Sequence, residues 1–110
     1  MAQLVRLCSI SEAPAANSVD VIAAPTLPVF GGKLCVANID GKFYAMDNDC
    51  PHRLGPLGEG TLEDGLVLCP WHAWGFDPKT GTCREFPQAH VRTYPVRVEG
   101  NDLLVEIDAG

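Results

Sequence analysis

The sequence predicts an all-β protein, an antiparallel sandwich or partial barrel, and three observations support this. No window of twelve residues has a convincing apolar period of 3.6, so no amphipathic helix is expected. The 110 residues include 11 glycines and 9 prolines, which favours short strands and turns over helices. Alternating apolar and polar segments are joined by tight-turn signals, as in hairpins. A chain of this length forms one domain, which we expect to span residues 1–110.

The first half is expected to supply four strands. Residues 9–15, which follow the first of them, contain Ser, Glu and Pro and predict a turn or one loose helical turn. Asp40-Gly41 predicts a two-residue hairpin loop, because both central positions of such a loop need a positive φ. The four strands are Gln3–Cys8, Asn17–Ala24, Lys33–Ile39 and Lys42–Asp47.

The character of the chain changes between residues 47 and 86. This segment holds both tryptophans and many glycines and prolines. Three short strands are expected here, over Leu66–Leu68, Ala73–Asp77 and Thr82–Glu85, with a turn at residues 77–81. We interpret residues 47–86 as a small subdomain inserted between the strands of a larger β-structure.

The last 18 residues predict a second hairpin. Thr93–Glu99 alternates well, and Pro95 within it indicates an edge strand or a bulge because proline has no N–H to donate. Gly100-Asn101 signals a tight turn, and Asp102–Asp108 returns as the partner strand. The residues expected to face inward are Leu103, Val105 and Ile107.

The charge of the chain limits its partners. The formal net charge is −6, with only 8 Lys and Arg residues and no cluster of them. This balance argues against nucleic acid and anionic membrane surfaces, and it fits a carrier that docks on a basic patch of a partner. No run approaches the roughly 20 apolar residues of a membrane span, and the N-terminus does not resemble a signal peptide.

Five cysteines are present. Cys8, Cys35 and Cys83 have strand-like neighbours, and we expect them to be buried, reduced thiols. Unpaired cysteines without a signal peptide suggest a reducing cytoplasm.

Two short cysteine–histidine motifs organise the segment at 47–86. Cys50-Pro51-His52 is followed, after sixteen residues, by Cys69-Pro70-Trp71-His72. Thiolate and imidazole are ligands for iron, zinc and copper, and a proline directly after each cysteine stiffens the turn that presents it. The pattern predicts a metal or iron–sulfur site at the tips of two facing loops.

The order of the four ligands indicates which metal is bound. A structural zinc finger usually pairs Cys with Cys and His with His, whereas here each loop supplies one of each. The mixed order suits a two-iron cluster in which one iron takes both thiolates and the other takes both imidazoles. The motifs C-P-H-R-L-G and C-P-W-H-A-W-G-F resemble those of the Rieske [2Fe–2S] family, and the flanking strands fit a single Rieske domain. A zinc-stabilised binding module remains the alternative.

The resemblance implies a function. Cys50, His52, Cys69 and His72 would hold one [2Fe–2S] cluster in a protein that carries one electron and is not itself an enzyme. The sequence looks like the ferredoxins of bacterial ring-hydroxylating dioxygenases, which take electrons from a flavin-containing reductase and pass them to a terminal oxygenase. The small Rieske subunit of assimilatory nitrite reductase, which works with a large subunit, is the alternative within the same fold.

Four positions further imply a low reduction potential. High-potential respiratory relatives carry a Ser and a Tyr where this chain has Trp74 and Phe76, and their disulfide brace would fall at Gly55 and Trp71. The missing hydroxyl donors predict a potential near the low end of the Rieske range, about −150 mV.

Two interpretations are open for the tryptophans near the motifs. Trp71 and Trp74 either shield the cluster from water or line a docking surface, or they simply pack the small subdomain. Arg53 and His90 are expected at the surface.

Overall fold

A computed structural model describes residues 2–24, 32–49, 55–71 and 74–108 of the chain. Within these ranges the chain is built from antiparallel strands in three small sheets, with two short 3-10 turns. The all-β prediction is therefore confirmed, and the sheets do not close into a barrel. No helix among the described residues is long and apolar enough to cross a membrane.

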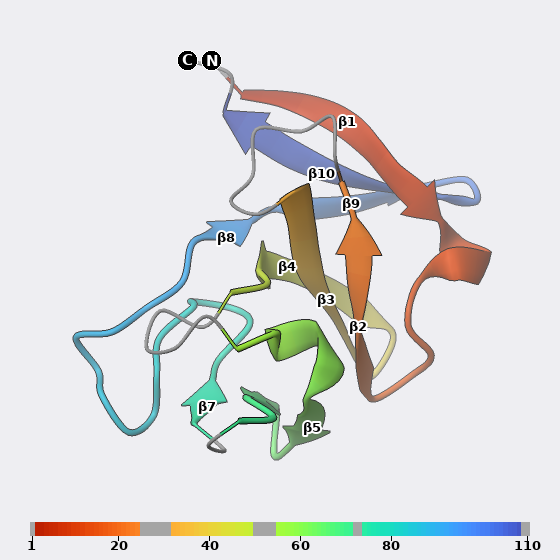
Figure 1. Cartoon of the computed structure of the whole chain (residues 1–110). Coiled ribbons are helices and arrows are strands. Elements are labelled where there is room, and N and C mark those ends of the chain that lie inside the picture. The colour runs from red at the N-terminus through yellow and green to blue at the C-terminus, as the bar shows by residue number, and fades with distance from the viewer. Residues whose placement is uncertain (1, 25–31, 50–54, 72–73, 109–110) are drawn as a thin grey trace.

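The first sheet joins the two ends of the chain. Its strand order is β1-β10-β9, from β1 (Ala2–Ser9), β10 (Asp102–Asp108) and β9 (Val96–Glu99). Ala2 lies opposite Asp108 in the antiparallel register. Both termini therefore lie at one end of the molecule, away from β5 and β7 (Figure 1).

The second sheet has the order β2-β3-β4-β8. Its members are β2 (Ser18–Ala23), β3 (Lys33–Ile39), β4 (Lys42–Asp47) and β8 (Thr93–Tyr94). The hairpin between β3 and β4 has φ angles of 52° at Asp40 and 89° at Gly41, as the turn signal predicted. Pro95 separates β8 from β9, and β9 is an edge strand, as expected for a proline at this point.

The third sheet, β5-β6-β7, lies between β4 and β8 in the sequence. It contains β5 (Thr61–Glu63), β6 (Leu66–Leu68) and β7 (Gly75–Phe76). β6 lies where a strand was predicted, β7 lies within a longer predicted strand, and β5 was not predicted. The predicted strand over Thr82–Glu85 was wrong, because that segment makes only isolated bridges, such as Phe76 with Cys83. The subdomain limits at 47 and 86 stay a prediction.

The two 3-10 turns complete the chain. The first, Ile10–Glu12, is the predicted helical turn, and Ser9 and Glu12 cap each other across it. The second, Leu57–Glu59, was not predicted.

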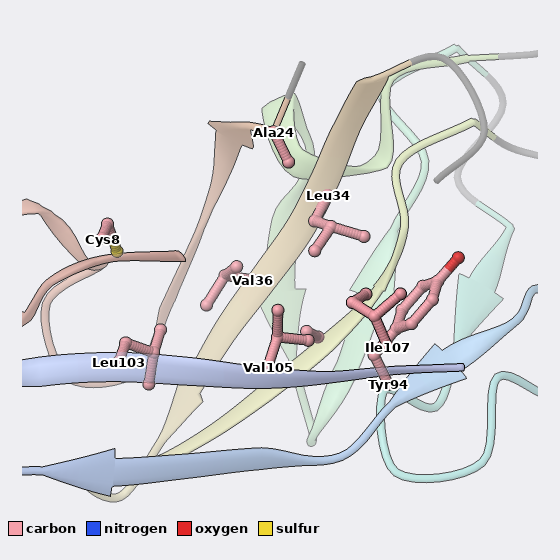
Figure 2. Close-up of a cluster of buried hydrophobic side chains, with 9 residues drawn as sticks. Cys8, Ala24, Leu34, Val36, Tyr94, Leu103, Val105 and Ile107 are labelled. Carbon is pink, nitrogen blue, oxygen red and sulfur yellow. The ribbon is translucent and has the colours of Figure 1, made fainter. Parts of the chain in front are cut away.

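The core has two parts because β3 is buried on both faces. Leu34 and Val36 point toward Leu103, Val105 and Ile107 of β10, which confirms the inward positions predicted for that strand (Figure 2). Cys35 and Ala37 alternate with them and face the opposite way, into a cluster with residues of the third sheet. The sheet that carries β3 thus connects the base of the domain to the segment that bears the cysteine–histidine motifs.

Candidate metal centre

Cys69 is the one predicted ligand within the described residues. Cys50, His52 and His72 lie outside them, as does Arg53. No group of three His, Cys, Asp or Glu residues suited to a metal occurs in the described ranges alone. What the structure describes is therefore Cys69 and the bases of both ligand loops.

Cys69 directly follows β6 and is 2% exposed. Its backbone N–H donates to the carbonyl oxygen of Trp74 at 2.9 Å. This bond joins the end of β6 to the residue just before β7. The two residues are neighbours because the β6–β7 pair ends at Leu68 opposite Gly75.

The first ligand loop is closed at its base by Asn48, which is 3% exposed. The Asn48 carbonyl accepts the Leu57 N–H at 2.7 Å, and its side-chain Oδ1 accepts the Gly58 N–H at 2.8 Å. Asp49 also forms an isolated antiparallel bridge with Pro56. Residues 48–49 and 56–58, on the two sides of the first motif in the sequence, are thus joined by one asparagine and one bridge.

The second ligand loop has a matching side-chain contact. Oε1 of Glu85 accepts the Gly75 N–H at 2.9 Å, and Oε2 accepts from Arg84 Nε at 2.8 Å. Both contacts favour the carboxylate form, first the Gly75 bond and then the Arg84 bond, so the pKa of Glu85 lies below its ordinary value. Neither Asn48 nor Glu85 was identified from the sequence, because neither belongs to a recognisable motif.

The two loops meet at Gly55. A Cβ atom built on Gly55 would lie 2.7 Å from Cys69 Sγ and 3.4 Å from Trp71 Cγ. The prediction that two loops face each other is confirmed for their described parts. Because a side chain at position 55 would occupy the space next to the Cys69 sulfur, the local structure suits a thiolate held at a junction of two loops.

The contact between Gly55 and Trp71 also bears on the missing brace. These are the two positions at which the resemblance places the disulfide of respiratory relatives. They are neighbours in space, but a glycine and an indole ring occupy them.

The surface beside Cys69 is aromatic and acidic. Trp71 is 60% exposed and lines a shallow groove of about 400 Å³ together with Glu59 and Pro70. Trp74 is only partly exposed, packs on the second core cluster and stacks on Phe86 at 5.1 Å between ring centroids. Of the two readings left open, Trp74 therefore packs the small sheet, and Trp71 lies at the surface.

The predictions for the three other cysteines and for His90 are confirmed. Cys8, Cys35 and Cys83 are buried and free, and His90 is exposed. Burial raises the pKa of the Cys35 thiol far above its usual value, which keeps it protonated. Burial, and then the neighbouring Asp47, raises the pKa of Asp49. Phe76 is fully buried in the core cluster that also contains Cys69.

Comparison with known proteins places the chain in a family. Residues 5–95 match the Rieske [2Fe-2S] domain. The chain belongs to the Rieske [2Fe–2S] family. It is 33% identical over 102 residues to the 3-phenylpropionate/cinnamic acid dioxygenase ferredoxin subunit of Escherichia coli strain K12, covering 91% of this chain and 90% of that one.

Solved structures agree with this assignment. The ferredoxin of Sphingomonas yanoikuyae B1 has a TM-score of 0.80 and 28% identity, covering 96% of this chain and all of that one. A Mycobacterium tuberculosis structure named for the small subunit of an NADH-dependent nitrite reductase has a TM-score of 0.82, covering 100% of this chain and 99% of that one. At 19% identity, that second similarity shows the fold alone.

Family membership establishes the cofactor and the class of this Rieske protein. The cofactor is a [2Fe–2S] cluster, and the protein is an electron-carrier component of the ferredoxin type rather than a catalytic oxygenase.

Proposed function

We propose that this ferredoxin holds its cluster through Cys50, His52, Cys69 and His72, and that it carries single electrons from a flavin-containing reductase to a terminal oxygenase. When bound, the cluster supplies a one-electron redox centre whose potential is raised by imidazole ligation. The chain's own residues hold the two loops together and exclude water around Cys69. The observation that carries the proposal is the junction of the two loops, where Gly55 leaves room for the buried Cys69 sulfur.

The choice of an oxygenase as electron acceptor rests on the sequence relatives. The dioxygenase ferredoxin subunits are 33% identical to this chain over nine tenths of its length, whereas the nitrite reductase similarity is a likeness of fold. The exposed Trp71 beside Cys69 and the net charge of −6 suit docking through the ligand-loop end against a basic partner surface. The reducing cytoplasm is the compartment that fits the free buried thiols.

The ligand set is tested by the composition and spectrum of the purified protein. We expect two irons and two acid-labile sulfides per chain after growth in iron-replete medium. His52→Cys and His72→Cys should each lower the potential if the cluster assembles, because a thiolate replaces a neutral ligand. A colourless protein with one zinc would instead support the zinc-stabilised module, and an unchanged potential in an intact cluster would remove that histidine from the set.

The electron acceptor is tested by the potential and by reconstitution. The fully buried Phe76 and the stacked Trp74 have no hydroxyl to offer to the cluster, so we expect about −150 mV at neutral pH. Protein-film voltammetry should find this value, and a midpoint above about +100 mV would point to a quinol-linked role. Turnover of a terminal oxygenase with a flavin reductase should require this chain. Support of a nitrite reductase large subunit alone would favour the alternative.

A further inference from the structure

Gly75, the first residue of β7, contacts two consecutive residues, Arg84 and Glu85. It is buried and lies directly after the second ligand loop. Its N–H donates to Glu85 Oε1 at 2.9 Å, and its carbonyl accepts the backbone N–H of Arg84 at 2.7 Å. The end of the second ligand loop is therefore fixed from both sides by the 84–85 segment.

The carboxylate that receives the Gly75 N–H is itself held in place. Arg84 donates to Glu85 Oε2 through both Nε and Nη2. A Cβ atom on Gly75 would lie 3.3 Å from Arg84 Cζ, so the guanidinium covers this glycine. Oε1 of Glu85 accepts from the Gly75 N–H and, at 3.9 Å, from Cys83 Sγ, whereas Oε2 accepts from Arg84. Bonds of the charge-assisted kind are the stronger ones.

A neutral acceptor can also satisfy a backbone N–H at this place in a loop, as Asn48 does for Gly58 in the first loop. Glu85 differs because it adds a negative charge at the base of the second loop, partly offset by Arg84. Negative charge near a redox centre disfavours the reduced state, and partial exposure weakens this effect without removing it. The side chain that accepts a backbone N–H beside the first ligand loop, Asn48, is therefore neutral, whereas the one beside the second, Glu85, is charged.

We propose that Glu85 is a positioning residue for the second ligand loop, and that its charge, balanced by Arg84, sets part of the cluster's reduction potential. The proposal rests on the ligand set given under the proposed function. It makes two separable claims, one about the geometry of the loop and one about charge.

The two claims are tested by two substitutions at one position. Glu85→Gln keeps the acceptor oxygen and removes the charge, so its potential should rise while its loop stays ordered. The expected shift is about threefold in the reduction equilibrium, or about 28 mV at 59 mV per tenfold step. The reduction potential of Glu85→Ala should rise as well. This substitution should also speed hydrogen exchange in a peptide covering residues 74–84 and alter the EPR line shape of the reduced cluster.

Arg84→Gln and a distant acid–base pair complete the design. Arg84→Gln removes the balancing cation and should lower the potential, an opposite sign that a purely structural role would not produce. Glu99 pairs with Arg97 at 3.6 Å on β9, in the sheet away from β5 and β7 (Figure 1). Glu99→Gln and Glu99→Ala should leave the potential, exchange and EPR signal unchanged.

Each claim has a result that would overturn it. A wild-type potential in both Glu85→Gln and Arg84→Gln would overturn the role of charge. Wild-type exchange and EPR line shape in Glu85→Ala would overturn the positioning role. Absence of a [2Fe–2S] spectrum in the wild-type protein would instead overturn the proposed ligand set, so the two failures are distinguishable.

Discussion

Replacing Asn48 with alanine should loosen the first ligand loop without unfolding the domain. Asn48 Oδ1 accepts the N–H of the buried Gly58 at 2.8 Å. Alanine leaves this donor without its acceptor, which costs about 1–3 kcal/mol. If the bond is broken when the loop opens to release iron, a loss of about 2 kcal/mol speeds opening by about 30-fold, since each 1.36 kcal/mol is a tenfold change.

The assay is iron loss to a chelator without denaturant, followed by the decay of visible absorbance. Under these conditions release reports local opening of the loop rather than global unfolding. The EPR signal of the reduced protein, recorded before the challenge, checks that the starting cluster is intact.

Asn38 provides a matched control because it is also a buried asparagine, 6% exposed, with two hydrogen bonds. It donates to the Pro14 carbonyl at 3.0 Å and accepts the Gly41 N–H at 2.9 Å. Asn38→Ala should lower the free energy of unfolding by a similar amount while iron release stays at the wild-type rate. Equal release rates in Asn48→Ala and wild type, or in the two alanine variants, would refute the role given to Asn48.

Three further substitutions test other contacts. Burial, and then a hydrogen bond to the Asp47 carboxylate, raise the pKa of Tyr94 above its ordinary value of about 10. The unfolded chain therefore loses this proton first, and stability falls as the pH rises above 10, by about 1.4 kcal/mol at pH 11. Denaturation measured at pH 8–11 should show this loss in wild type in addition to the loss from the buried Cys35 thiol, which Tyr94→Phe keeps. Identical slopes in the two proteins would contradict the role of Tyr94. Gly55→Ala should cost about 1–3 kcal/mol and reduce iron and sulfide per chain by crowding Cys69, whereas Gly41→Ala, whose Cβ meets nothing within 4 Å, should keep full iron. Phe76→Tyr should raise the midpoint potential in voltammetry if its hydroxyl reaches a ligating sulfur; an unchanged value would mean that the ring edge faces elsewhere.

Strand positions could be predicted from the sequence where turn residues or a proline marked the strand ends. Asp40-Gly41 and Pro95 act through their own φ angles and N–H groups, so their effects do not depend on distant residues. Asp64-Gly65 carries the same turn signal, with φ of 51° and 76°, and joins β5 to β6. β5 was not predicted because Thr61–Glu63 is short and the turn signal that directly follows it was not used.

The candidate site was only partly predictable. Cysteine and histidine have few alternatives as ligands, so their spacing predicts four ligand residues, of which the structure describes Cys69. Asn48 and Glu85 act through bonds to Gly58 and Gly75, each ten residues away in the sequence. Asparagine and glutamate are common surface residues, and only the folded arrangement shows that these two accept backbone N–H groups beside the ligand loops.

The pairing of β1 with β10 makes the two chain ends a single point of attachment. Because Ala2 is opposite Asp108 and the small sheet lies at the other end (Figure 1), a tether or surface bonded at either terminus leaves the ligand loops facing outward. The same geometry allows the domain to be inserted into a longer polypeptide. The two points at which the flanking chain would enter and leave the domain are only as far apart as two neighbouring strands of a sheet. An electrode coupled through either terminus would therefore leave the small sheet, and with it the proposed cluster site, toward solution, where a diffusing partner can reach it.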